Sequence, residues 1–182
     1  MSYDFRLFRP KPGEDPIVTA RCEADDFPDT PPDPEKEVLK RRIADALIAH
    51  NPRLEVFQVN FEEIARIRKM SVDEARLRFR HLELNTPEDD PTGIQITLWD
   101  DDASVTVPYW HEGPEAANVF RVIFSQMEII CREAGYLVYD PHVDRVFDPA
   151  TGFENALACY RDTIRKVRSI APASENPWWK FW

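Results

Sequence analysis

Residues 93–110, GIQITLWDDDASVTVPYW, alternate apolar and polar side chains on both sides of three consecutive aspartates. Such alternation is typical of a strand with one buried face, because successive side chains of a strand point to opposite faces. The two runs predict an antiparallel hairpin. With a four-residue loop, Asp100–Ala103, Trp99 would face Ser104. The buried face would then hold Ile94, Ile96, Leu98, Val105, Val107 and Tyr109, and a slip of one residue would scramble this separation.

The rest of the chain gives start and stop signals for several helices. A capping residue precedes each of three expected helices, in the pairs Asp33 with Pro34, Asn60 with Glu63, and Ser71 with Glu74. We expect helices at about 34–50, 61–69, 72–82, 114–134 and 153–169, and further strands at about 3–8, 54–59, 136–140 and 145–148. Hairpins mixed with helices favour an α+β fold, with an antiparallel or mixed sheet, a central hairpin and helices packed largely on one face.

The length of 182 residues fits one sizeable domain. We expect this α+β domain to span residues 1–170. A linker and an aromatic C-terminal tail, which ends in WWKFW, would occupy residues 171–182. Because so many exposed rings would form a sticky patch, we expect the tail to dock on the protein's own surface, with engagement of a partner as the alternative.

The charge of the chain is unevenly distributed. The net charge is −10, and residues 83–115 hold nine acidic residues and no Lys or Arg. A field of this sign repels nucleic acid and attracts basic partners, so we expect a basic protein partner and no nucleic acid. We expect a cytoplasmic chain, because no apolar run is long enough for a membrane span and the start of the sequence has no secretory signal. The three cysteines are odd in number, widely spaced and not in CxxC form, which is typical of reduced core thiols.

The aspartate triplet is first of all a turn, because Asp side chains hydrogen-bond to nearby backbone amides. Its spacing does not match an EF-hand loop, and we expect no metal and no cofactor. The polar face of the hairpin is a candidate partner-binding patch, with aromatic anchors inside a charged rim. The alternative is that a helix, the tail or a second copy of the chain covers this face of the hairpin. The candidate residues are Trp99, Asp100, Asp101, Asp102, Trp110, His111 and Glu112.

A second candidate lies at residues 62–84, EEIARIRKMSVDEARLRFRHLEL, which resemble a helix-turn-helix. Ser71 would cap the second helix, and Arg76, Arg78 and Arg80 would lie on it. The pattern departs from that family because Lys69 replaces the turn glycine and Arg78 stands where an apolar residue is expected. Since the chain is acidic overall, a pair of packing helices is the simpler interpretation.

An enzyme is the third class, but the sequence has no phosphate loop, GxSxG or HExxH motif, so we expect no catalytic residues. The stretches MSYDFRLF, VPYWHEG, GYLVYDP and PWWKFW resemble those of uncharacterised small bacterial proteins, some of which are associated with polymorphic-toxin immunity. The resemblance implies a cytosolic protein that masks the active site of a toxin. The resulting hypothesis is an acidic, immunity-type binding protein, with a regulator or a small enzyme as alternatives.

Overall fold

The computed structural model describes residues 2–21 and 30–170. The predicted docking of the aromatic tail, 171–182, falls outside these residues. The strands are β1 (Ser2–Phe8), β2 (Glu55–Val56), β3 (Leu82–Asn85), β4 (Gln95–Leu98), β5 (Asp102–Pro108), β6 (Leu137–Asp140) and β7 (Arg145–Phe147). The helices are α1 (Pro16–Arg21), α2 (Pro34–His50), α3 (Phe61–Arg68), α4 (Val72–Arg78), α5 (Gly113–Ala134) and α6 (Pro149–Ile170).

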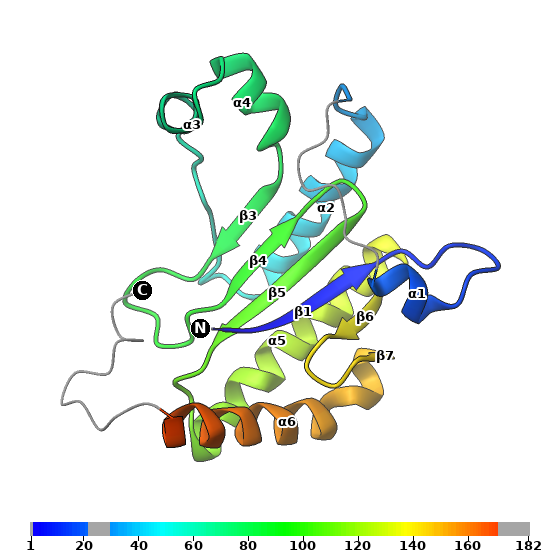
Figure 1. Ribbon diagram of the computed structural model, residues 1–182, viewed down its shortest axis with the longest axis vertical. Coiled ribbons are helices and arrows are strands. Elements are labelled where there is room, and N and C mark those ends of the chain that lie inside the picture. The colour runs from blue at the N-terminus through cyan, green and yellow to red at the C-terminus, as the bar shows by residue number, and fades with distance from the viewer. Residues whose placement is uncertain (1, 22–29, 171–182) are drawn as a thin grey trace.

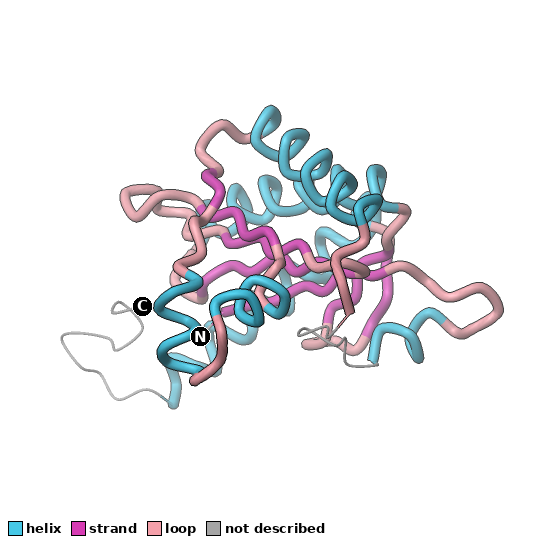
Figure 2. Tube along the Cα trace, turned by 90° about the horizontal axis from the view of Figure 1, so that it is seen from above, coloured by secondary structure: helices cyan, strands magenta, loops and turns pink. Residues whose placement is uncertain are grey.

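The seven strands found in the described part of the chain form one antiparallel sheet, in the order β2-β3-β4-β5-β1-β6-β7 (Figure 1). Helix α5 packs against both α2 and α6, and α2 and α5 also contact the sheet. Figure 2 shows the long helices on one side of the strand layer. The α+β class predicted from the sequence, with helices largely on one face, is therefore confirmed.

The core lies between the sheet and these helices. The predicted buried face of the hairpin is confirmed, since its six residues are at most 9 % exposed. Strand β1 adds three residues to the same face, because Tyr3 pairs with Val107 and Phe5 with Val105. The hydrophobic core is completed by apolar side chains of the helices, among them Ile43, Leu47, Phe120, Ile123, Met127, Leu157 and Tyr160.

The predicted hairpin register is wrong by two residues. Leu98 pairs with Ala103 and Thr97 with Ser104, so Trp99 faces Asp102 and not Ser104. The loop is therefore Asp100–Asp101 rather than four residues. A shift of two residues returns every side chain to the same face, and for this reason the burial pattern alone could not tell the two registers apart.

Several helix boundaries follow from local capping. The backbone N–H groups of Glu63 and Glu74 donate to the side chains of Asn60 and Ser71, as predicted. Gly135 ends α5 with a φ of 69°, a conformation that glycine adopts without steric cost. The predicted helix over 72–82 is too long, because the chain leaves α4 at Arg78 and the alternating LELN stretch forms β3.

The predicted strand over 54–59 is reduced to the two residues of β2, at one edge of the sheet. Helix α1 was not predicted. It begins at Pro16, where the Asp15 carboxylate accepts a hydrogen bond from the backbone N–H of Ile17. Its end lies over the face of the sheet opposite the long helices, since Arg6 donates to the Ala20 carbonyl oxygen over 2.9 Å. No helix of the described residues covers the remainder of that face, at the β3–β4 side (Figure 1).

Candidate functional site

The aspartate triplet joins the hairpin to other parts of the protein through ion pairs. Asp100 lies 3.0 Å from the Lys40 ammonium and 2.5 Å from the Arg80 guanidinium. Asp101 lies 2.6 Å from Lys36, and Asp102 lies 3.0 Å from Arg6. Each of the three carboxylates is therefore matched by a cation from a distant segment, which leaves little uncompensated charge at this end of the hairpin.

Asp100 is the most strongly held of the three. Its side chain is 15 % exposed, and that of Lys40 is 3 % exposed. Burial by itself raises the pKa of Asp100, but hydrogen bonds from Arg80 and Lys40 outweigh this effect and hold the pKa below its usual value. The Lys40 ammonium also donates to the Arg80 carbonyl oxygen over 3.0 Å. Lys40 and Asp100 thus form a buried structural link between α2 and the hairpin loop.

The seven candidate residues do not form one patch. Trp99 and the aspartates lie at one end of β5, and Trp110, His111 and Glu112 lie beyond its other end. Asp102 is the first residue of β5, and the rest of the strand separates the two groups, a distance of roughly 20 Å at the rise of a strand. Trp99 and Trp110 therefore lie at opposite ends of β5 and do not belong to one cluster of side chains.

His111 is a structural residue. Its side chain is fully buried, and its Nε2 lies 2.8 Å from the Thr92 carbonyl oxygen. The His111 backbone N–H donates to the Tyr160 hydroxyl over 3.2 Å. These contacts fix the chain beyond β5 to both α6 and the β3–β4 loop.

Trp110, in contrast, is partly exposed and rigidly placed. Its indole N–H donates to the Pro91 carbonyl oxygen over 3.1 Å. Its ring lies directly over Gly93, where a Cβ atom would come within 2.6 Å of the ring. Gly93 also has a φ of +59°, so it provides both the turn and the space that this indole needs.

Trp110 forms one wall of an open groove with a volume of about 720 Å³. The floor is the polar face of the sheet, and the β3–β4 loop forms the rim. Its lining consists of Ser2, Asn85, Thr86, Pro87, Glu88, Asp90, Gly93, Ile94, Gln95, Thr106, Pro108 and Trp110. Every charged residue in this lining is acidic.

Most hydrogen-bond donors of the groove are already committed to acceptors of the protein. Ser2 and Thr106 donate to the carboxylate of Asp4 over 3.0 and 2.8 Å. The side-chain amides of Asn85 and Gln95 both donate to Glu83, over 2.7 and 2.9 Å. The polar floor therefore presents more acceptor capacity than donor capacity to a ligand.

Most carboxylates at or beside the groove lack the positively charged partner that each carboxylate of the triplet has. Asp90 is held by Arg53 at 3.0 Å. Asp4 receives hydrogen bonds from hydroxyl groups alone, and Glu88 is exposed and has no partner among residues 2–21 and 30–167. Glu83 has no Arg or Lys partner in the described part of the chain, and the Nε2 atom of His81 lies 3.9 Å from its carboxylate. Uncompensated negative charge in this region thus lies at the groove and not at the aspartate triplet.

The sequence analysis placed Trp110 in the candidate site but missed Asp4, Glu83, Asn85 and Glu88. Gln95 and Thr106 were assigned to the polar face of the hairpin, and this face is indeed the groove floor. The alternation of β1 could have added Asp4, because it pairs with Thr106 across the sheet. Asn85 and Glu83 were missed because no strand was predicted after the expected helix over 72–82, so nothing placed them beside Gln95.

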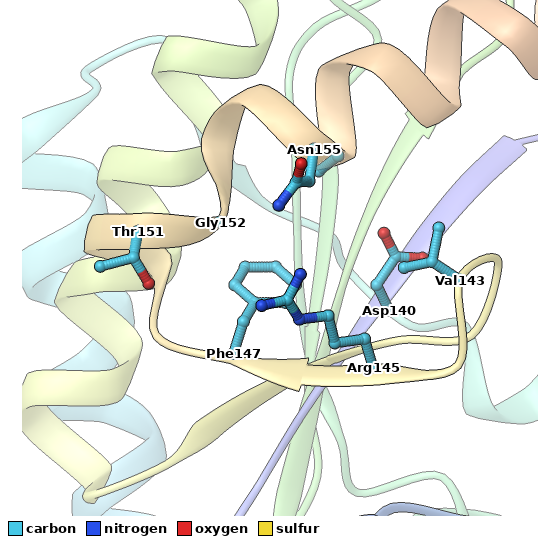
Figure 3. Close-up of a pocket in the computed structure, with 8 residues that line it drawn as sticks. Asp140, Val143, Arg145, Phe147, Thr151, Gly152 and Asn155 are labelled. Carbon is cyan, nitrogen blue, oxygen red and sulfur yellow. The ribbon is translucent and has the colours of Figure 1, made fainter.

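A second cavity lies between the β6–β7 hairpin and the start of α6 (Figure 3). Its volume is about 20 Å³, which is room for one water molecule. Asp140 at its edge is fully buried and accepts a hydrogen bond of 2.6 Å from the Tyr3 hydroxyl. Figure 3 shows the Phe147 ring beneath Gly152, where it closes this side of the cavity. The cavity is too small for an organic ligand.

Helices α3 and α4 stand apart from the helical layer that covers the sheet (Figure 1). They pack on each other around Ala65 and Ala75. Two arginines of the suspected recognition helix are engaged within the pair, since Arg76 lies over the Phe61 ring and Arg78 lies 3.2 Å from Glu74.

The third arginine, Arg80, was predicted to lie on that helix, but α4 ends two residues earlier. Its guanidinium lies 2.5 Å from Asp100. Each member of the predicted DNA-contacting set therefore has a partner within the chain, and Arg80 lies off the helix.

We expect no tight binding of duplex DNA. The net charge of −10 opposes contact with phosphates, and all three arginines already have partners within the chain. A gel-shift assay with a random-sequence duplex library at physiological ionic strength measures this. A salt-dependent, sequence-selective shift would restore the regulator hypothesis.

No family model, curated protein or solved structure matches this chain. Among the helices that the structure describes, none has the length and apolar character needed to cross a membrane.

Proposed function

We propose that this chain is a binding protein, and not an enzyme, that receives a basic segment of a protein partner in the Trp110 groove. The observation that carries the proposal is the groove itself, whose charged lining residues are all acidic. Asp4 and Glu83 lie beside it without an Arg or Lys partner in the described part of the chain. The proposed site of action is the cytoplasm.

The arrangement suits rapid capture of a basic partner. Uncompensated carboxylates raise the rate of encounter with a cationic surface, while a partly buried aromatic ring sets the lifetime of the complex. Trp110 is held by Pro91 and Gly93 before any partner arrives, so little conformational entropy is lost when it is covered.

The resemblance to proteins of polymorphic-toxin immunity supports a specific form of this function. In that form the partner is a basic toxin, and the groove receives a segment next to the toxin's active site. An inhibitor of this kind needs no catalytic group of its own. It needs a surface whose charge and shape match the toxin, and the acidic lining of the groove supports a match of charge with a basic one.

The test begins with the wild-type chain as bait in an extract of the source cells. The captured partner is then expressed in a heterologous host, alone and together with the chain. We expect a basic partner that stops growth alone, and growth that is restored by the wild-type chain. A variant with Glu88→Lys and Gln95→Lys, which reverses the charge of the groove, should fail to restore growth.

The matched control carries Val38→Lys and Glu154→Lys, two exposed positions on α2 and α6. It makes the same change in net charge but leaves the groove intact, and it should protect as well as wild type. Equal protection by the groove variant, or a captured partner that is acidic, would refute the proposed function.

A further inference from the structure

We propose that the group recognised in the groove is an arginine side chain, presented by an extended segment of the partner. This inference rests on the proposed function and adds to it the chemistry of the contact. It follows from the balance of donors and acceptors on the groove floor and from the aromatic wall beside it.

The first argument concerns a hydrogen-bond acceptor, the side-chain oxygen of Asn85, that has no donor. The side-chain oxygen of Asn85 is buried and accepts no hydrogen bond from the residues that the structure describes. A buried acceptor that stays unpaired costs about 1–3 kcal/mol. Its amide nitrogen already donates to Glu83. Because this oxygen has almost no exposed surface, a ligand donor reaches it only when the Asn85 side chain turns toward the groove, and that contact removes the penalty.

The second argument is that the row of side chains across the groove floor has more acceptors to spare than donors. Asn85, Gln95, Thr106 and Asp4 occupy neighbouring positions on β3, β4, β5 and β1. The donors of this row are used within the protein, and its two ends offer an amide oxygen and a carboxylate. With strands about 4.8 Å apart, these ends lie roughly 14 Å from each other. A ligand with several N–H groups and no acceptor fits such a floor best.

Arginine meets this requirement more fully than lysine. The guanidinium has five N–H donors in one plane and no acceptor, and it is weakly hydrated. A planar cation can also stack on an aromatic ring, and Trp is the best such partner. Trp110 lines the groove, and among the described residues that line it there is no Arg or Lys. The ammonium of lysine has fewer donors and loses more hydration on entry.

The partner's backbone is extended in this proposal because the groove is open. The groove follows the sheet face from Asn85 to Thr106 and Ser2, and Asp4 lies beside it, paired with Thr106 across the sheet. In an extended chain alternate side chains point the same way, so one arginine can enter while its neighbours remain outside. Glu88 at the rim adds an exposed carboxylate that attracts the incoming cation.

The experiment is a titration of the ¹⁵N-labelled full chain with three short peptides. Each peptide is Ac-Thr-Ser-Xaa-Ser-Thr-NH₂, in which Xaa is arginine, lysine or citrulline, the last being a neutral residue of nearly the same shape as arginine. The indole N–H of Trp110 and the side-chain amides of Asn85 and Gln95 report on the groove. The indole N–H of Trp99, at the other end of the hairpin, is the internal control.

We expect the arginine peptide to shift the three groove signals and to leave the Trp99 signal in place. The lysine peptide should bind at least about threefold more weakly, and the citrulline peptide should not bind measurably. Glu88→Gln should weaken the binding of the arginine peptide by about threefold, as expected for the loss of an exposed charge pair. Because Glu88 is exposed, this variant is expected to fold normally.

Equal affinity for the lysine or citrulline peptide, or shifts at Trp99 alone, would overturn the inference. An arginine peptide that shifts no groove signal would also overturn it. If the captured protein partner nevertheless perturbs Trp110, Asn85 and Gln95, the proposed function stands and the arginine contact is wrong. If the partner leaves these signals unchanged as well, both proposals fail.

Discussion

Asp100→Asn is expected to lower the free energy of unfolding by about 3 kcal/mol. The substitution removes the charge that faces two cations, and the Lys40 side chain is 3 % exposed. Lys40 then keeps Glu37 at 2.6 Å as its acidic partner, which places the expected loss at the lower end of the range for a broken buried pair. Chemical denaturation at pH 7, followed by circular dichroism, measures the change.

The matched control is Asp101→Asn in the same loop. The Asp101 side chain is 75 % exposed, so its pair with Lys36 should contribute no more than about 1 kcal/mol. Equal losses for the two variants would contradict the assignment of Asp100 as a buried structural link.

The same link predicts a dependence on pH. The pKa of Asp100 is lowered in the folded protein, so its stabilising contribution is present above the unfolded-state pKa of about 3.9. The contribution is lost as the pH falls through the lower, folded-state value. Below about pH 4 the difference in stability between wild type and Asp100→Asn should therefore shrink.

Trp110→Ala is expected to weaken the complex with the captured partner at least about 30-fold, chiefly through faster dissociation. The indole is a fixed wall of the groove, and loss of a buried aromatic anchor typically costs 2 kcal/mol or more. Surface plasmon resonance separates the two rates. Trp110→Phe keeps a ring over Gly93 but loses the hydrogen bond to Pro91, and it should fall between wild type and Trp110→Ala.

Trp99→Ala is the matched control for this measurement. Trp99 is also partly exposed, but it lies at the opposite end of β5, beside His81. Its loss should leave the affinity within about twofold of wild type, because contacts outside the interface are close to neutral. A larger effect at Trp99 than at Trp110 would move the binding surface to the aspartate end of the hairpin.

The hairpin shows that a sequence pattern can predict which side chains are buried without predicting the register of the strands. The alternation of residues 94–98 and 105–109 predicted which side chains are buried, because the period of a strand assigns each residue to a face. It did not determine the loop length. Registers that differ by two residues bury the same side chains, and the choice between them depends on contacts outside the hairpin, such as those from Lys40 and Arg80 to Asp100.

The candidate site was predicted less well than the fold, because the sequence does not show which charges are paired in the folded protein. The sum of charges over residues 83–115 is strongly negative, but a sum along the chain does not show which charges are paired in space. Cations from β1, α2 and the start of the β3 segment compensate the aspartate triplet. Asp4, in the N-terminal strand, remains without an Arg or Lys partner among the described residues and lies beside the groove.

The short elements were predicted poorly because their conformation also depends on contacts with distant parts of the chain. The stretch around Leu82 and Leu84 alternates over too few residues to be distinguished from a helix end, and pairing with β4 decides its conformation. The helix caps at Asn60 and Ser71 were predicted well, because each depends on a side chain and a backbone N–H only three residues away.

The central claim is that the Trp110 groove, and not the aspartate end of the hairpin, contacts the partner. Site-specific photo-crosslinking tests it most directly, with p-benzoylphenylalanine placed in the complex either at Gln95 on the groove floor or at Asp101 in the hairpin loop. We predict a covalent adduct with the partner from position 95 and none from position 101. An adduct from position 101 and none from position 95 would contradict the account.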